Sequence, residues 1–256
     1  MTPRPSLAVV IPAYNESQRI VPTIHGVVGC LRSWNRDFEV LVVDDGSHDE
    51  TSTLVDRLRS ELRELRLIRL AQNQGKGYAV RTGALNCRQE LILMCDADLA
   101  TPIEELARLE RAVASGADMA IGSRELDASD VKVETRWYRR LMGRTFHAVV
   151  ESLAVRGFKD TQCGFKLFKG PVAQDLFTRM RMDRFSFDVE LLVMAQRRKY
   201  RVDEVPVNWA HQPGSRVNLV TDSLRMLVDL VRIRRNCVRG AYDTPHVSAW
   251  PALDRT

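Results

Sequence analysis

Short runs of apolar residues recur along the first half of the chain and predict buried strands. Four runs are almost wholly apolar, as in strands covered on both faces of a parallel sheet; they are residues 7–11, 40–43, 91–95 and 119–122. A fifth run, residues 65–70, is more polar and is expected nearer an edge. Because helical patterns lie between these runs, the first 125 residues predict an open α/β sheet whose ligands bind beyond the carboxyl ends of its strands.

Helical periodicity predicts where the chain crosses from strand to strand. Apolar side chains at helical spacing predict a helix over residues 51–62, with Ser47 and Glu50 before it as a capping box. A second helix is predicted to start with Thr101 as N-cap, Pro102 at its first position and Glu104 at its third. Both helices would follow strands and lie against the sheet.

The second half is less regular. Apolar positions at helical spacing predict helices around residues 141–155, 187–195 and 223–235, and residues 202–209 predict a strand that Pro206 interrupts. The helix 223–235 is amphipathic, with a broad apolar arc opposite arginines. Residues 241–256, which include two prolines, are expected to form a loose tail.

Composition places the chain among ordinary globular proteins. It has 256 residues, of which 45% are hydrophobic and 28% charged, so a disordered or fibrous chain is excluded. The five cysteines form no C-x-x-C pair, which favours reduced thiols in the cytoplasm over a disulfide framework or a zinc site. No apolar run reaches the roughly 18–20 residues of a membrane span, and the N-terminus lacks a signal-peptide layout.

Positive charge is concentrated in two segments. Residues 131–144 and 225–239 each have a net charge of +4 on a chain whose total is +5, so the remainder is at −3. Two basic segments on a mildly acidic body indicate an anionic partner at specific places. The alternative is that they are merely solvated faces.

Three acidic clusters follow predicted strands. They are Asn15-Glu16, Asp44-Asp45-Gly46-Ser47 and Asp96-Ala97-Asp98. The carboxyl ends of parallel strands share one edge, so these clusters converge there, and such carboxylates suit Mg²⁺ or Mn²⁺ bridging a diphosphate. Each Asp alone could instead cap a helix. Neither a P-loop nor a G-x-G-x-x-G follows the first strand.

The ordered motifs resemble those of one enzyme family. V-V-I-P-A-Y-N-E, V-V-D-D-G-S, N-x-G-K-G (73–77), D-A-D and G-S-R (122–124) are similar to family 2 glycosyltransferases of GT-A fold. D-T-Q-C-G-F-K-L-F (160–168), F-D-V-E-L-L (187–192) and E-V-P-V-N-W…G-S-R (204–216) narrow the resemblance to polyprenyl-phosphate glycosyltransferases, most like the dolichyl-phosphate β-glucosyltransferase group. The resemblance spans residues 6–240. It implies a GT-A catalytic domain over residues 1–222, followed by the basic amphipathic helix 223–240, lying on a membrane surface or packed, and the tail 241–256.

The resemblance also implies roles for single residues. Nucleotide-sugar binding falls to Pro12, Tyr14, Glu16, Asp44, Asp45, Lys76 and Asp96, and the Mg²⁺ or Mn²⁺ ion to Asp96 and Asp98. Catalytic roles fall to Arg124, Asp188 and Arg216. Acceptor-phosphate binding falls to Arg124 and Lys166, and arginine's affinity for phosphate adds Arg136, Arg139 and Arg140. The alternatives are that Tyr14 and Phe165 are core aromatics, that Lys76 is a solvated loop lysine and that Asp188 belongs to a helix start. One departure is Ala100, because mannosyl members often have Gln there.

The implied reaction moves a hexose, with glucose from UDP-glucose as the best candidate, onto a polyprenyl or dolichyl phosphate with inversion. GDP-mannose or another sugar or acceptor is the alternative, and a sugar nucleotidyltransferase or a nucleic-acid-binding protein are the rival classes. We expect an anionic membrane surface as a partner, no nucleic acid, and a homodimer as an open alternative for the C-terminal helix. The expected location is the cytoplasm, peripherally at the cytoplasmic face of a membrane.

Overall fold

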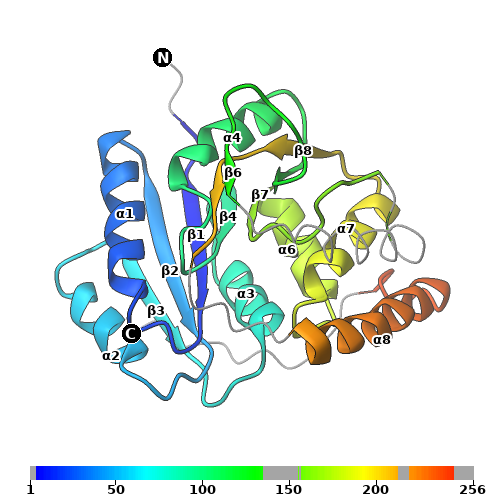
Figure 1. Cartoon of the computed structure of the whole chain (residues 1–256), viewed down its shortest axis with the longest axis horizontal. Helices are drawn as coiled ribbons and strands as arrows, with labels where there is room; N and C mark the ends of the chain where they lie inside the picture. The colour runs from blue at the N-terminus through cyan, green and yellow to red at the C-terminus, as the bar shows by residue number, and fades with distance from the viewer. Residues whose placement is uncertain (1–3, 135–154, 156, 213–218, 245–256) are drawn as a thin grey trace.

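Seven strands form one open sheet in the computed structural model, which describes residues 4–134, 155, 157–212 and 219–244 (Figure 1). In spatial order they are β3 (Leu65–Arg69), β2 (Phe38–Asp44), β1 (Leu7–Ala13), β4 (Leu91–Cys95), β7 (Phe165–Lys169), β5 (Met119–Ser123) and β8 (Val202–Pro206). Neighbouring strands are parallel except that β7 runs antiparallel to both β4 and β5. The predicted mostly parallel α/β sheet is confirmed.

The apolar runs coincide with strands because each is buried on both faces. Every one of the four runs lies within a strand, and the more polar fifth run forms β3 at the sheet edge, as expected. The predicted strand over residues 202–209 is interrupted at Pro206, as expected, since β8 ends there. Trp209 and Ala210 form β9, which pairs in parallel with β6 (Val133–Glu134) in a separate small sheet.

Helices cover both faces of the sheet. One face carries α1 (Ile20–Ser33), α2 (Thr51–Arg59) and α4 (Leu106–Ala114), the last preceded by the 3₁₀ turn η1 (Ile103–Glu105). The other carries α3 (Lys76–Leu85), α6 (Gly170–Arg179), α7 (Phe187–Arg197) and α8 (Leu219–Val238). Successive residues of β1 alternate between the two cores, as the strand period of two requires.

The predicted start of α2 at residue 51 is confirmed, but both predicted N-terminal caps are wrong. α2 begins at Thr51 without a capping box, because Asp49 accepts the backbone N–H of Thr51 at 3.0 Å and Ser47 is engaged elsewhere. After Thr101 the chain forms η1 before α4, and Pro102 precedes the helical residues without a side-chain cap. The hydroxyl of Thr101 instead lies 4.0 Å from the Cys163 sulfur.

The C-terminal helix packs on the core next to α7 (Figure 1). Met226, Leu230 and Ile233 are buried on it, and Asp229 accepts a hydrogen bond of 2.8 Å from Ser186 before α7. Tyr242, in the stretch expected to be loose, is only 2% exposed. The predicted helix over 141–155 lies outside the described residues except for the buried Val155, as does the rest of the tail from residue 245.

Candidate functional site

The loops that carry the sequence motifs meet at one edge of the sheet. β1, β2, β4 and β5 are parallel, so the segments after them emerge at their common carboxyl edge. β7 runs the opposite way, so the segment before it, residues 160–164, reaches the same edge. The D-T-Q-C-G motif therefore faces the D-A-D and G-S-R motifs.

The loops after β1 and β2 are joined through Asn15. Its backbone N–H donates to the Ser47 hydroxyl at 2.8 Å, and its side-chain oxygen accepts the backbone N–H of His48 at 2.8 Å. Asn15 has a positive φ of 53°, which Asn tolerates better than most residues. Tyr14 meets the His48 ring edge-on at a centroid distance of 6.4 Å. These contacts bring the P-A-Y-N-E and D-D-G-S motifs together, as the predicted donor pocket requires.

Three other residues that were predicted to bind the nucleotide sugar lie in or next to the same two loops. Pro12 is opposite Val43 in the strand register, and the buried Asp44 accepts the backbone N–H of Ser47 at 3.1 Å. Glu16 makes a two-pronged contact with Arg19, with hydrogen bonds of 2.7 and 2.8 Å. Their proposed contacts with the nucleotide stay predictions.

Asp45 organises the N-x-G-K-G loop. Its carboxylate is 3% exposed and accepts hydrogen bonds from the side chain of Asn73 at 2.9 Å and from the backbone of Gln74 and Gly75 at 2.8 Å each. Burial raises the pKa of Asp45, although these hydrogen bonds oppose the shift. Asp45 thus fixes the conformation of the N-x-G-K-G loop through these hydrogen bonds, a role that the sequence did not reveal.

Lys76, at the start of α3, forms an ion pair with the first Asp of D-A-D. Its ammonium lies 2.7 Å from Oδ1 of Asp96. Burial opposes the charged form, but the carboxylates of Asp96 and Asp188 outweigh burial and raise the pKa of Lys76. The lysine is thus held charged beside the acidic cluster, and the alternative of a solvated loop lysine is wrong.

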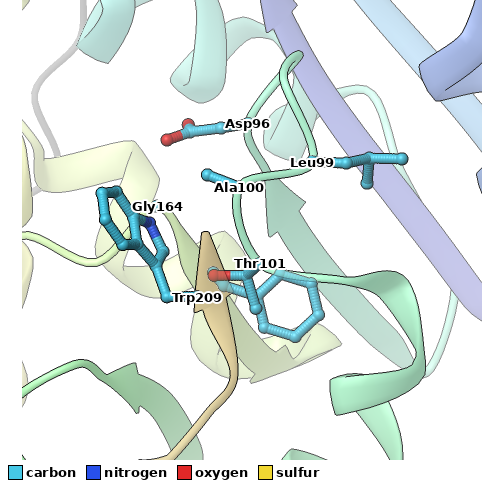
Figure 2. Close-up of a pocket in the computed structure, with 7 residues that line it drawn as sticks. Asp96, Leu99, Ala100, Thr101, Gly164 and Trp209 are labelled. Carbon is cyan, nitrogen blue, oxygen red and sulfur yellow. The ribbon is translucent and has the colours of Figure 1, made fainter. Parts of the chain in front are cut away.

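Asp96 borders a narrow pocket between the donor and acceptor motifs (Figure 2). The pocket is lined by Asp96, Leu99, Ala100, Thr101, Gly164, Phe165 and Trp209. A Cβ atom at Gly164 would lie 2.0 Å from Oδ2 of Asp96, so only glycine permits this approach. Trp209 was not among the predicted site residues, although the E-V-P-V-N-W motif that contains it was noted.

The D-A-D segment offers oxygen ligands for a divalent cation. Asp98 accepts the backbone N–H of Ala100 at 3.1 Å, and its other oxygen lies 3.9 Å from Arg19. Within the part of the chain that the structure describes, no three His, Cys, Asp or Glu side chains gather as a metal cage. Mg²⁺ commonly binds through one or two carboxylates together with substrate phosphates. Asp96 and Asp98 fit that pattern.

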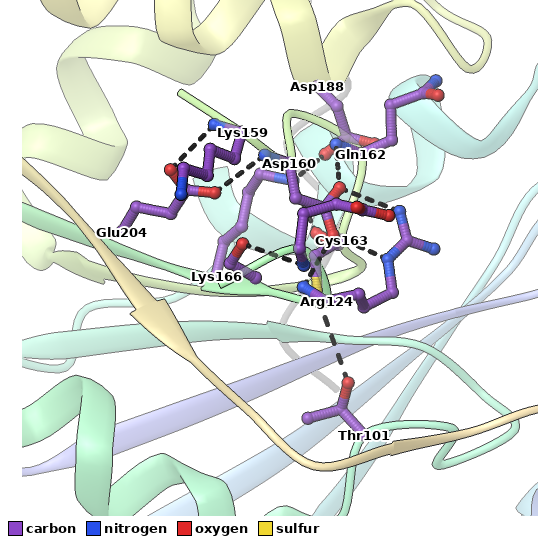
Figure 3. A network of polar contacts seen from close by, with 11 residues as sticks. Thr101, Arg124, Lys159, Asp160, Gln162, Cys163, Lys166, Asp188 and Glu204 are labelled. Carbon is purple, nitrogen blue, oxygen red and sulfur yellow. Dashed lines mark hydrogen bonds and ion pairs between the residues drawn. The ribbon is translucent and has the colours of Figure 1, made fainter. Parts of the chain in front are cut away.

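Arg124 is held by a carboxylate from the acceptor motif (Figure 3). Its Nε and Nη2 donate to the two oxygens of Asp160 at 2.6 and 2.8 Å, and its backbone N–H donates to the same carboxylate at 3.0 Å. Burial opposes ionisation of Asp160, but Arg124 lowers its pKa to about 2. The guanidinium also lies 5.7 Å from the centre of the Trp209 ring, which places it beside the pocket.

Asp160 in turn is fixed by the strand that carries the E-V-P-V motif. The Glu204 side chain accepts the backbone N–H of Lys159 at 2.9 Å and of Asp160 at 2.7 Å. Both residues lie in motifs of the sequence, but neither Asp160 nor Glu204 was among the predicted site residues. Their conjunction depends on β8 lying next to β5, which only the fold shows.

Lys166 and Asp188 form a buried ion pair. The Lys166 ammonium is fully buried and donates to Asp188 and to the Cys163 carbonyl, each at 2.6 Å. Burial raises the pKa of Asp188, with Lys166 and Lys76 opposing the shift. Because the Lys166 side chain is fully buried, it has no exposed surface with which to meet an acceptor phosphate in this arrangement. Its ion pair with Asp188 joins β7 to α7. Direct roles for both residues stay predictions.

Four predicted site residues lie outside the described residues. They are Arg136, Arg139, Arg140 and Arg216. Of the residues predicted for the acceptor side, the structure therefore describes Arg124, Lys166 and the segment 160–165.

Comparison with known sequences identifies the family. Residues 8–177 match the family model for glycosyl transferase family 2. A dolichyl-phosphate beta-glucosyltransferase of Trichomonas vaginalis is 41% identical over 234 residues, which cover 88% of this chain and 69% of that protein. The human dolichyl-phosphate beta-glucosyltransferase is 36% identical, over 94% of this chain and 78% of that protein.

Solved structures share the fold. Glucosyl-3-phosphoglycerate synthase of Mycobacterium tuberculosis with phosphoglyceric acid superposes with a TM-score of 0.68 at 16% identity, over 90% of this chain and 80% of that one. The same enzyme with Mg²⁺ and uridine diphosphate gives 0.65 at 16% identity, over 95% and 81%. The motifs, the sheet edge and these likenesses agree: the chain belongs to glycosyl transferase family 2, has the GT-A fold and is similar to dolichyl-phosphate beta-glucosyltransferases.

Proposed function

We propose that this chain transfers glucose from UDP-glucose to the phosphate of a polyprenyl lipid, with inversion at the anomeric carbon. The observation that carries the proposal is the pocket in which donor-side Asp96 faces acceptor-side Gly164 and Phe165. We infer glucose as the sugar and a lipid phosphate as the acceptor from relatives that are named dolichyl-phosphate beta-glucosyltransferases. Direct attack from the face opposite the leaving diphosphate inverts the anomeric centre.

The donor is bound by the loops after β1, β2 and β4. Tyr14, Glu16 and Asp44 border the nucleoside, and the loop anchored by Asp45 presents Lys76 to the donor. Lys76 is paired with Asp96, which compensates its buried charge and holds the ammonium at this edge of the sheet, where it would meet the donor phosphates.

A Mg²⁺ or Mn²⁺ ion fits Asp98 together with Asp96. Bound there, it would neutralise charge on the departing diphosphate. The proposal is supported by the two carboxylates at one strand end and by solved relatives of the same fold that contain these ions.

The acceptor is a phosphate and needs little activation. A phosphate monoester with a second pKa near 6 is largely dianionic at neutral pH, so the main difficulty is to hold two anions together. Arg124 is suited to this task because Asp160 fixes its planar guanidinium beside the pocket. We extend this role to Arg136, Arg139, Arg140 and Arg216 as predictions from the sequence.

We further propose that α8 attaches the protein to an anionic membrane surface. Among the described residues, all large apolar side chains that are exposed lie on this helix: Leu227, Val228, Val231 and Val238. Exposed arginines flank them, so the face combines apolar insertion with attraction to anionic headgroups. In the part of the chain that is described, no helix is both long and apolar enough to cross a bilayer.

The same helix adjoins the acceptor segment. The Gln162 side chain lies 3.8 Å from the Met226 sulfur of α8. A membrane contact through α8 would therefore bring lipid phosphates near the acceptor side. We place this contact at the cytoplasmic face, since none of the five cysteines forms a disulfide, as is usual in a reducing compartment.

Donor screening tests the proposed reaction. The purified protein is given a short polyprenyl phosphate, Mg²⁺ or Mn²⁺, and UDP-glucose, UDP-N-acetylglucosamine or GDP-mannose in turn, and products are detected by mass. We expect glucosyl polyprenyl phosphate to form fastest. Preference for GDP-mannose would overturn the sugar assignment, and formation of a nucleotide sugar from sugar 1-phosphate and a nucleoside triphosphate would indicate a nucleotidyltransferase.

A further inference from the structure

Glu190, on α7, is a buried carboxylate that the proposed reaction does not use. Its side chain is 0% exposed. It accepts the backbone N–H of Arg181 at 3.0 Å, the backbone N–H of Met182 at 2.8 Å and the Tyr242 hydroxyl at 2.7 Å. A carboxylate with this many donors fixes the backbone that supplies them.

The backbone fixed by Glu190 is the support of the Lys76 loop. A Cβ atom at Gly75 would lie 2.4 Å from the Asp183 carbonyl oxygen, and one at Gly77 would lie 2.6 Å from that of Met182. The two segments therefore pack backbone against backbone, which only glycine allows. The Asp183 carbonyl also accepts the backbone N–H of Tyr78 at 3.0 Å.

A second contact joins the segment 180–184 to α3. The Arg81 Nη1 atom donates to the Met180 carbonyl at 2.9 Å, and its Nη2 atom lies 3.3 Å from the Asp183 carboxylate. α3 begins at Lys76, whose ammonium reaches Asp96. A displacement of the segment 180–184 would thus move the lysine at the donor site.

The residues after α8 complete the arrangement. Tyr242 is buried against Glu190, and the Ala241 carbonyl accepts a hydrogen bond of 2.9 Å from the Arg181 side chain. Asn236 of α8 lies within 3.4 Å of the Tyr242 hydroxyl. The segment 180–184 is therefore held both by Glu190 and by the chain that follows α8, and these two contact each other through Tyr242.

We infer that Glu190, with Tyr242, is a positioning residue for the donor site: together they hold the segment 180–184, which sets the Gly75–Gly77 backbone and so places the Lys76 ammonium. The inference rests on the proposed function, because it assigns the donor phosphates as the group that Lys76 meets. Because both side chains are buried, they would act through this segment and not by contact with the donor.

Substitutions at Glu190 separate positioning from simple loss of stability. Glu190→Leu removes the acceptor for the Arg181 and Met182 N–H groups, and we expect KM for UDP-glucose to rise at least about five-fold, with KM for the lipid acceptor within about two-fold of wild type. Glu190→Gln keeps a carbonyl oxygen for these N–H groups and should restore the donor KM. If both variants keep the wild-type donor KM, the inference is wrong.

Tyr242→Phe provides a second test that decides the matter if Glu190→Leu does not fold. It removes one hydrogen bond and should raise the donor KM about two- to three-fold. Tyr200→Phe is the matched control, because the Tyr200 hydroxyl donates its hydrogen bond to the Asp175 carboxylate, at 2.9 Å, and not to Glu190. Equal donor KM values for the two variants and wild type would overturn the role of Tyr242.

The same proteins distinguish this inference from the proposed function. If the wild-type protein binds UDP-glucose in calorimetry but transfers no glucose to lipid phosphate, the reaction assignment fails and the variants are ranked by UDP-glucose affinity. Weaker binding in Glu190→Leu with recovery in Glu190→Gln then supports the inference. If wild type binds no UDP-glucose, both the reaction and the inference fall.

Discussion

Arg124 makes three hydrogen bonds to a single carboxylate, and this geometry defines what it can do. Its Nε, Nη2 and backbone N–H all donate to the Asp160 carboxylate. Asp160 is itself held by Glu204, whose carboxylate accepts the Asp160 backbone N–H. The guanidinium is therefore fixed in plane and direction. A fixed, planar charge beside the pocket suits a phosphate that must approach a second anion.

We expect Arg124→Lys to lower kcat/KM for transfer about a hundred-fold or more, because an ammonium keeps the charge but loses the two-pronged contact with Asp160. Steady-state rates with UDP-glucose and a short polyprenyl phosphate measure the loss. Circular dichroism and thermal unfolding check that the fold is retained. A rate near that of wild type would move the phosphate role to another arginine.

Glu190 predicts a pH dependence of stability. Burial raises its pKa to about 7, although hydrogen bonds from Tyr242, Met182 and Arg181 and the charge of Arg81 oppose the shift. Between its ordinary pKa of 4.5 and about 7 the folded chain binds more protons at this site than the unfolded chain, so stability falls as the pH rises. Below pH 4.5 this shift contributes roughly 3 kcal/mol to the free energy of unfolding, and the contribution is lost as the pH rises above 7.

Urea unfolding of wild type and Glu190→Gln between pH 4.5 and 8 measures this contribution. The variant cannot ionise at this position, so its stability relative to wild type should increase as the pH rises through this range. Other titrating groups are shared and cancel in the difference. Two parallel stability curves would show that Glu190 does not carry the shift.

At the scale of elements, the antiparallel strand β7 decides how the site is assembled. It inserts between β4 and β5, so that the residues before it, not after it, reach the carboxyl edge. This places Gly164 against Asp96 and Asp160 against Arg124. An all-parallel sheet would carry the D-T-Q-C-G motif to the opposite edge.

Gly164→Ala should therefore abolish most transfer while leaving the fold intact. The new Cβ would lie 2.0 Å from Oδ2 of Asp96 and must displace the carboxylate from the pocket. We expect loss of kcat/KM by about a hundred-fold and weaker Mn²⁺ binding in a fluorescence or calorimetric titration. If this variant binds Mn²⁺ with wild-type affinity, the position of the Asp96 carboxylate does not matter for Mn²⁺ binding, which would contradict its assignment as a metal ligand.

Gly29→Ala is the control for that substitution. Gly29 is an exposed residue of α1, and a Cβ there meets nothing within 4 Å. Alanine in a helix interior is favoured over glycine by roughly 0.5–1 kcal/mol, so the control should unfold at higher urea and transfer glucose like wild type.

At the scale of the whole molecule, α8 has one buried and one exposed apolar face. Met226, Leu230 and Ile233 close the core beside α7, whereas Val228 and Val231 are 68% and 61% exposed. Figure 1 shows α8 at the opposite end of the sheet from α2. One helix thus combines core packing on one side with an exposed apolar face on another, and this exposed face is the one proposed to meet the membrane.

We predict that the protein binds vesicles containing anionic lipid and is released by salt. Replacing Arg232, Arg234 and Arg235 by Gln should weaken vesicle binding at least about ten-fold, since each arginine near an anionic surface contributes up to about 1 kcal/mol. Sedimentation with vesicles of increasing phosphatidylserine content measures binding. KM for a long-chain acceptor should rise more than KM for a short one.

Replacing Arg57, Arg59 and Arg63 by Gln is the matched control. These exposed arginines lie on and just after α2, so the change in net charge is the same but on another part of the surface. This variant should bind vesicles like wild type. If the two triple variants bind equally, α8 is not the membrane contact, and its exposed face is assigned to a dimer, which sedimentation velocity would detect.

The sequence by itself determined the order of strands and helices in the first half, the edge position of β3 and the convergence of three acidic motifs. The physical reason is local: buried parallel strands require continuous apolar runs, and parallel strands present their carboxyl ends together. Tertiary structure alone decided the roles of Asp45, Asp160, Lys166 and Glu190. Each is a charged side chain whose partner lies 22 or more residues away, or in a backbone segment that the fold brings close, and no periodic pattern records such a contact.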